Sequence, residues 1–325
     1  MIYYYLAVMM KYYQLLLLTC LTMACTAGYA QAKKEKNKEI LVYQCLRYND
    51  SVHVKQTEVS IAHWLAYVYA KFEDHPDGDP DPGEVAKFLP DSVEQSNQFL
   101  FDMFLRYWKI IVTNELDEEQ YEKFVWNSQS VRSFPLYLTK EEKKEYDHIK
   151  TFLNKPITGL TFEAIEEFMI WQSEVLDGWR KEDENYTHEV RFLPRLIYDD
   201  LIESTKTGLR NSKEKDGTLS VVGDSVNLKG CHLYNYKGSQ SCPMSEGRFK
   251  EYGTLTSTVA VDSYNPDIDG YYNLLGNVAE MTATKGIAKG GHWGMYASEI
   301  LKNEDLKYST PSSKIGFRFM VVVRK

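Results

Sequence analysis

The spacing of apolar residues predicts two amphipathic helices and a buried strand at the end of the chain. From Thr57 to Phe72 apolar side chains recur every three or four positions, with Thr57 or Ser60 available as an N-cap. Residues 162–175 repeat this pattern and predict a second helix. Residues 317–323 are almost continuously apolar, which is typical of a central strand with both faces covered.

Further elements make this a mixed chain. β-Branched and aromatic residues at 40–48 predict a strand near its beginning. Residues 75–150 form a region rich in aromatic and charged residues, and we expect it to be a helical insert. Two interpretations of that insert stay open, a surface for a specific partner and extra helices that pack on the core. The sequence therefore predicts an α+β fold.

The beginning of the chain has the pattern of an export signal. A short apolar run at 15–25 follows Lys11, ends near Ala30-Gln-Ala32, and is too short to span a bilayer comfortably. We interpret residues 1–32 as a signal peptide, 33–39 as a flexible leader and 40–325 as the folded domain. The expected location is the periplasm or the outer membrane. Membrane association would arise only through a lipid on Cys25, the alternative processing site.

Charge and cysteine content narrow the candidate partners. The net charge is -8 and no basic stripe appears, which argues against nucleic acid as a partner. Cleavage of the signal would leave Cys45, Cys231 and Cys242, an odd number. Export permits disulfides, so a bridge between Cys231 and Cys242 and three free thiols both stay open.

Three motifs in the last sixty residues follow one another in a fixed order. They are Gly270-Tyr-Tyr-Asn-Leu-Leu-Gly-Asn-Val-Ala-Glu280, Lys289-Gly-Gly-His-Trp293 and Ile315-Gly-Phe-Arg318. This series resembles the formylglycine-generating enzyme (sulfatase-modifying factor) superfamily, whose members show a GNVWEW-type run, then RGGSW, then IGFR.

The resemblance extends upstream. Thr57-Glu-Val-Ser60, Lys155-Pro-Ile-Thr-Gly-Leu-Thr-Phe-Glu-Ala164 and Arg191-Phe-Leu-Pro194 are similar to three earlier motifs of that superfamily. The six ordered matches span residues 40–325. They imply a formylglycine-generating-enzyme-like, C-type-lectin-related fold with irregular loops.

The resemblance also implies a structural calcium ion. Asn273 and Glu280 would supply side-chain oxygens, and Gly276 and Val278 would supply carbonyl oxygens. Amide, carboxylate and carbonyl oxygens suit Ca²⁺ rather than a softer metal. Without the resemblance, this spacing is weak evidence for calcium, and the alternative is a hydrogen-bonded turn.

Catalysis is where this chain departs from the superfamily. The enzyme's two copper-binding cysteines would fall at Met295 and Ile300, and no cysteine occurs after Cys242. Two thiolates hold Cu(I) in such a site, so we expect no copper and no catalytic residues. His292 has two open interpretations, a metal ligand or base and a hydrogen-bonded structural residue.

These features together are similar to one branch of the superfamily, the non-catalytic gliding-motility and type IX secretion lipoproteins of Bacteroidota. The segment Gly230-Cys-His-Leu-Tyr-Asn-Tyr-Lys237 is also similar to a motif of that branch. The resemblance implies a structural or binding protein of the cell envelope, partnered by an envelope complex or by copies of itself. The alternatives are a sulfatase-modifying oxidase-like enzyme and a lectin-like receptor that binds a ligand through residues 293–313.

Overall fold

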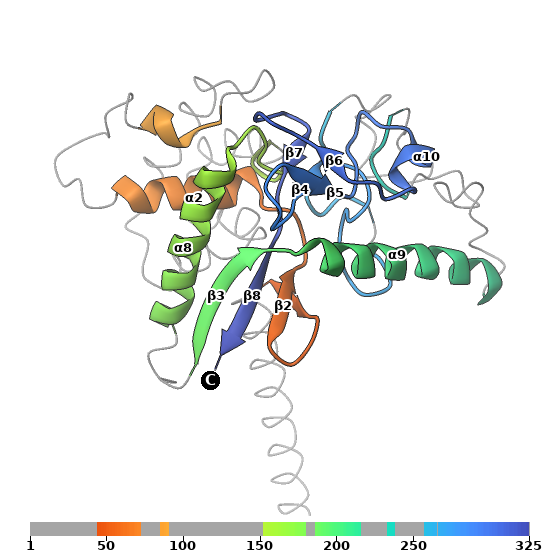
Figure 1. The fold of residues 1–325 in the computed structure, drawn as a ribbon, viewed down its shortest axis with the longest axis horizontal. Helices are drawn as coiled ribbons and strands as arrows, with labels where there is room; N and C mark the ends of the chain where they lie inside the picture. Colours follow the sequence, from red (N-terminus) through yellow and green to blue (C-terminus); the bar gives the residue numbers. More distant parts are fainter. Residues whose placement is uncertain are drawn as a thin grey trace, which may run out of the picture. The chain divides into compact units, whose positions relative to one another are not determined.

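A computed structural model describes residues 44–72, 85–90, 152–179, 186–215, 233–237, 257–264 and 266–324. Helices and strands are mixed throughout these ranges, which confirms the predicted α+β class (Figure 1). The predicted signal peptide and leader, the Cys231–Cys242 pair and all of the predicted insert except residues 85–90 lie outside the described residues.

The first sheet brings the two ends of the described chain together. It has the order β1-β2-β8-β3, and every neighbouring pair is antiparallel. Its strands are Cys45–Arg47, Val52–Lys55, Phe319–Arg324 and Thr187–Phe192 for β1, β2, β8 and β3 respectively. The closing strand β8 is thus central, between an early strand and one from the middle of the chain, and it is apolar because its first three residues are buried.

The second sheet is smaller and has the order β6-β5-β4-β7. Its strands are Leu306–Lys307, Ile287–Lys289, Ala279–Met281 and Ile315–Gly316 for β6, β5, β4 and β7 respectively. β4 and β7 pair in parallel, and the other two pairs are antiparallel. Two residues, Phe317 and Arg318, connect β7 to β8, so the chain passes from one sheet into the other at this point.

Two helices, α2 (Ile61–Phe72) and α8 (Phe162–Trp179), form the aromatic core beside the first sheet. The rings of Trp64 and Phe168 stack with centroids 5.6 Å apart, and Phe168 meets Phe317 edge-on at 5.4 Å. Buried aromatic pairs of this kind contribute beyond their apolar area. Both predicted helices are therefore confirmed, and the helix periodicity marked their buried faces.

The start of α2 differs from the expectation. The Oγ of Ser60 accepts a hydrogen bond from the N–H of His63, so Ser60 is a capping residue and the helix begins at Ile61 instead of Thr57. Residues just before it are extended: the N–H of Val59 donates to the carbonyl of Phe317, and Ser60 bridges to Pro156. These backbone pairings stop the helix from extending further toward the N-terminus.

Three further helical elements complete the described fold. They are the 3-10 helix η1 (Ala86–Phe88), the long helix α9 (Arg195–Lys215) and the short helix α10 (Ala297–Ile300). Among them, η1 contacts α2 through Phe88. The buried side of α9 packs into a cluster that includes Tyr198, Ile202, Leu274 and Ile300. Within the described ranges, none of the helices combines the length and apolarity needed to cross a lipid bilayer.

Candidate functional site

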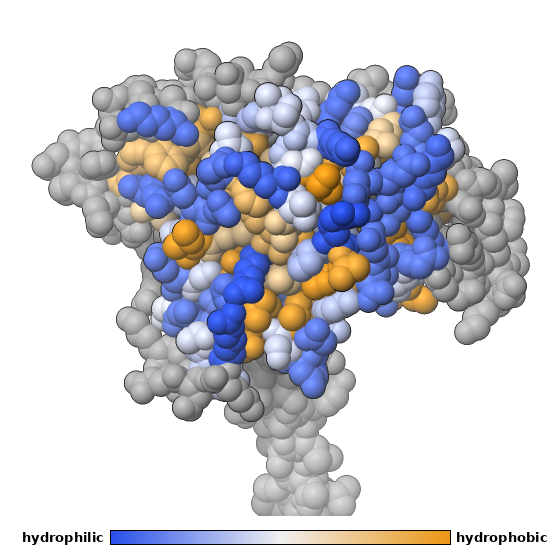
Figure 2. Space-filling model, viewed as in Figure 1, coloured by the Kyte–Doolittle hydropathy of each residue, from blue (hydrophilic) through white to orange (hydrophobic). Residues whose placement is uncertain are grey.

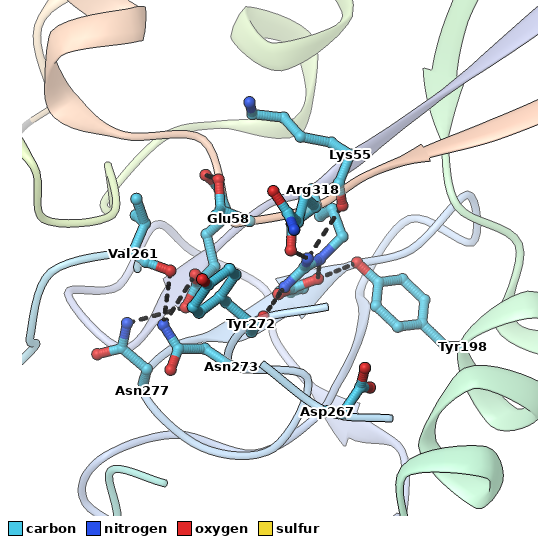
Figure 3. A network of polar contacts seen from close by, with 12 residues as sticks. Lys55, Glu58, Tyr198, Val261, Asp267, Tyr272, Asn273, Asn277 and Arg318 are labelled. Atoms are coloured by element: carbon cyan, nitrogen blue, oxygen red, sulfur yellow. Dashed lines mark hydrogen bonds and ion pairs between the residues drawn. The ribbon is translucent and has the colours of Figure 1, made fainter. Parts of the chain in front are cut away.

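A buried arginine stands where the two sheets meet. The side chain of Arg318 has no solvent exposure, and each of its five N–H groups has an acceptor (Figure 3). Two of its nitrogens contact the carboxylate of Glu280, with Nε 3.0 Å from Oε2 and Nη2 2.8 Å from Oε1. The other N–H groups donate to the carbonyls of Lys55, Gln56 and Tyr272 at 3.0, 2.6 and 2.7 Å. Arg318 thus joins both sheets and the turn before β4.

Electrostatics favour the charged form of Arg318. Burial, the largest single effect, acts to lower the pKa of Arg318, but the acidic groups around it, Glu280 first, together raise that pKa above its ordinary value. The phenol of Tyr198, on α9, donates to Oε2 of Glu280 at 2.6 Å. Burial and the adjacent carboxylate raise the pKa of Tyr198 well above its usual range, so the phenol stays a donor. Glu280 is therefore fully engaged by Arg318 and Tyr198.

A second carboxyl group, Glu58, lies in the same network. It precedes α2, has no solvent exposure, and accepts hydrogen bonds from Nδ2 of Asn277 at 2.8 Å and Nδ2 of Asn273 at 3.2 Å. Burial raises the pKa of Glu58 to about 8, and the charge of Arg318 opposes that rise. Near neutral pH the network therefore contains one ion pair, Arg318 with Glu280, and a second carboxyl that is largely protonated.

The turn from Gly270 to Val278, which precedes β4, has backbone φ angles that its residues adopt readily. Asn273 and Asn277 have φ of 51° and 57°, in the left-handed region that asparagine tolerates better than most residues. At Gly276 an added Cβ would lie 2.1 Å from the carbonyl oxygen of Asn235, so only glycine lets the two segments approach. The N–H of Asn277 donates to that same carbonyl at 2.9 Å. The turn is thereby locked against the segment at 233–237.

Three of the predicted calcium donors lie in this turn, whereas the fourth, Glu280, lies just after it in β4. The side chains of Asn273 and Glu280 have different partners. Nδ2 of Asn273 donates to Glu58 and, at 3.0 Å, to the carbonyl of Val261, while its Oδ1 is buried and has no hydrogen-bond partner among the described residues. Glu280 instead faces Arg318 and Tyr198. In the described part of the chain, no three His, Cys, Asp or Glu side chains cluster as metal ligands. Asn273 therefore offers a free oxygen, and Gly276 and Val278 lie between it and Glu280.

Met295, in the loop after β5, and Ile300, at the end of α10, are the positions that correspond to the copper-binding cysteines of the resembling enzyme. Ile300 is buried in the core, and an added Cβ at Gly291 would lie 2.6 Å from its Cγ1. Met295 is partly buried against the same apolar cluster. Apolar side chains thus occupy both positions, and these residues do not fit a copper ion.

His292 in this loop is a neutral, hydrogen-bonded residue. Its Nδ1 accepts the N–H of Gly294 at 3.0 Å, which puts the proton of the neutral ring on Nε2. Burial and the nearby Lys314 ammonium lower the pKa of His292 to about 4. The neighbouring Trp293 is half-buried, whereas Phe317 is completely buried.

Sequence reasoning missed the buried polar network itself. The sequence motifs include Glu58 and Arg318 but indicate no chemical role for either, and no sequence pattern points to Tyr198. A signal existed for Arg318: it lies between Phe317 and Phe319 in a run of apolar residues, where an unpaired buried charge would be very costly. Its partner, 38 residues away, is not visible from the sequence.

Comparisons with known proteins give only distant similarities. No protein-family model matches the chain, and no curated protein matches it either. The solved structure of PvdO from Pseudomonas aeruginosa is 16% identical with a TM-score of 0.30, and the match covers 52% of this chain and 63% of that one. CarF is 13% identical over 86% of this chain and 92% of that chain, with a TM-score of 0.37. Treponema denticola variable protein 1 is 14% identical over 87% and 92%, with a TM-score of 0.31.

Proposed function

We propose that this protein is a non-catalytic, exported structural or binding component of the cell envelope, with a formylglycine-generating-enzyme-like, C-type-lectin-related fold. The observation that carries the proposal is that two apolar residues, Met295 and Ile300, stand where the resembling enzymes have their copper-binding cysteines. Copper-dependent oxidation in the resembling enzymes needs two thiolates at these positions. Ile300 cannot ligate a metal, and its side chain is part of the core.

The buried network supports a role that depends on a rigid surface. Arg318 holds the turn before β4 through Tyr272 and the C-terminal end of β2 through Lys55 and Gln56. The N–H of Trp293 donates to the carbonyl of Asn277, which ties the loop after β5 to the same turn. Loops whose backbone is held by buried hydrogen bonds present their exposed side chains in one arrangement, and this lowers the entropic cost of binding a partner.

Calcium belongs to the same proposal. The unpartnered Oδ1 of Asn273 is the donor that fits, because a buried carbonyl oxygen without a partner is costly and a cation would satisfy it. The carbonyls of Gly276 and Val278 would complete the neutral donors. Glu280 is bound by Arg318 and Tyr198, so it would contribute charge to such an ion and would need to release a partner to ligate it. When bound, the ion would serve only to stabilise the turn.

The test is an affinity purification from solubilised envelopes, with the tagged protein expressed at its native level and co-purifying proteins identified by mass spectrometry. A stoichiometric envelope complex, or the protein bound to itself, is the expected result. The same purified protein, loaded with copper and given a cysteine-containing sulfatase peptide, is expected to consume no oxygen.

Two outcomes would contradict the proposal. Copper-dependent oxygen consumption with conversion of the peptide cysteine would establish the oxidase-like alternative. Recovery of a glycan and no protein partner would favour the lectin-like receptor. In either case the role as a structural component of the envelope would be wrong.

A further inference from the structure

Two lysines from other segments of the chain lie over aromatic rings of the loop after β5. The Nζ of Lys237 is 4.5 Å from the ring centroid of Tyr296, and the Nζ of Lys314 is 5.7 Å from the ring centroid of Trp293. We call these four residues the lysine–aromatic strip. Tyr296 is 54% exposed, and both lysines are exposed, so the strip faces solvent.

Both lysines contact the loop after β5. The N–H of Lys237 donates to the carbonyl of Met295 at 2.8 Å, which joins the segment at 233–237 to the loop. The side chain of Lys314 reaches the same loop, since its Cε would lie 3.6 Å from a Cβ at Gly294. The two lysines therefore lie beside one short stretch of loop, and both belong to segments outside it.

The polar groups of the strip and of the adjacent His292 are mostly hydrogen-bond donors. The lysines supply two ammonium groups, and neutral His292 carries its proton on Nε2. Glu299 is the acidic residue nearest in the chain, and its Oε2 already accepts the N–H of Tyr296 at 2.8 Å. The protein as a whole has a net charge of -8, whereas the two lysines give the strip a local positive charge. Its natural complement is a ligand rich in acceptors and negative charge.

We propose that the lysine–aromatic strip binds an acidic segment, rich in Asp and Glu, of a protein partner. The inference rests on the proposed function, since it names the chemistry of the partner. Carboxylate side chains can pair with the two ammonium groups while each lysine stays over its aromatic ring. Acidic glycans are the weaker candidate, because sugar rings dock flat on free aromatic faces and here a lysine lies over each ring.

Loop rigidity favours such binding. The N–H groups of Trp293, Gly294 and Met295 donate to the carbonyl of Asn277, to Nδ1 of His292 and to the carbonyl of His292, respectively. The strip is thus formed before a partner arrives, and little backbone entropy is lost on binding.

Fluorescence anisotropy tests the proposal. The probe is a fluorescein-labelled peptide of alternating Glu and Ser, and the matched peptide has Gln in place of Glu. We expect the Glu peptide to bind at least about tenfold more tightly than the Gln peptide, and its affinity to fall as salt is added. Lys237→Gln and Lys314→Gln should each weaken binding about threefold to tenfold, and the double variant more. Lys285→Gln, which removes an exposed lysine paired with Glu163, is the control and should leave affinity unchanged.

Equal affinities for the two peptides, or equal losses in the Lys285 control, would overturn the proposal. Tighter binding of soluble polygalacturonate than of the Glu peptide would assign the strip to an acidic glycan instead. The purification of the preceding subsection, repeated with the double variant, separates the two levels of inference. A complex retained by the variant would refute the strip alone, whereas no complex with the unmodified protein would refute the proposed function.

Discussion

Replacing each buried carboxyl of the network by its amide gives a direct test of which one carries charge. Glu280→Gln keeps the size of the side chain but removes the negative charge that faces Arg318. Glu58→Gln makes the same chemical change at a carboxyl whose pKa burial has raised to about 8. The two variants should therefore differ strongly near neutral pH, although both residues are buried.

The magnitudes follow from the partners of each group. With Gln at 280, Arg318 stays buried without a counter-ion, and the short hydrogen bond from Tyr198 loses its charged acceptor. Breaking a buried ion pair in this way costs about 3–5 kcal/mol of unfolding free energy. Glu58 is mostly neutral, so its amide alters only the hydrogen bonds from Asn273 and Asn277, at a cost of about 1 kcal/mol.

The pH dependence of the Glu58 variant has a definite sign. The folded protein keeps the Glu58 proton up to about pH 8, while the unfolded chain loses it near 4.5. Between these values the folded state binds more protons, so the unmodified protein becomes less stable as pH rises through this window. Glu58→Gln removes that loss. Its deficit relative to the unmodified protein should shrink from pH 5 to pH 8.

Urea unfolding followed by tryptophan fluorescence measures all three proteins. Glu163→Gln, at an exposed pair with Lys285, is the control and should show no measurable change. Equal destabilisation by the amides at 58 and 280, or a larger effect at 58, would refute the assignment of the charge to Glu280. A Glu58→Gln deficit that stays constant with pH would refute the raised pKa.

Three further predictions concern other parts of the molecule. Gly276→Ala should lower the free energy of unfolding by about 2–4 kcal/mol, because the new Cβ meets the Asn235 carbonyl and the residue has a positive φ. Gly178→Ala in α8 is the control: it has open space around it and should be neutral or stabilise by up to about 1 kcal/mol. Comparable urea midpoints for the two variants would contradict this prediction. Burial lowers the pKa of His63 to about 3, so below about pH 6.5 the unfolded chain binds a proton that the folded protein does not. The free energy of unfolding should therefore fall with decreasing pH by up to about 1.4 kcal/mol per pH unit. Thermal melts of His63→Gln should lack this slope, and an unchanged slope would contradict the lowered pKa. Calcium at about 100 times its Kd should add about 3 kcal/mol, and Asn273→Ala should abolish the gain; a melting temperature that does not respond to chelator would rule the ion out.

The sequence determined those features that depend on local spacing. The apolar repeats specified α2 and α8, and the continuous apolar run specified a buried closing strand, because periodicity reports which face of an element is covered. It also indicated a turn that contains Asn273, Gly276 and Val278, because residues close together along the chain have few backbone arrangements available. Glu280 follows this turn in β4.

Only the tertiary structure decided which polar groups face one another. Glu58 meets Asn273 and Asn277 more than 200 positions away, and Glu280 meets Arg318 because β4 and β7 pair in parallel and the chain then crosses into the other sheet. The same crossing explains why Glu280 faces a guanidinium instead of standing free beside Asn273. Pairing between distant strands depends on the packing of the whole core, and a buried charge takes whichever partner that packing brings within reach, which no local pattern encodes.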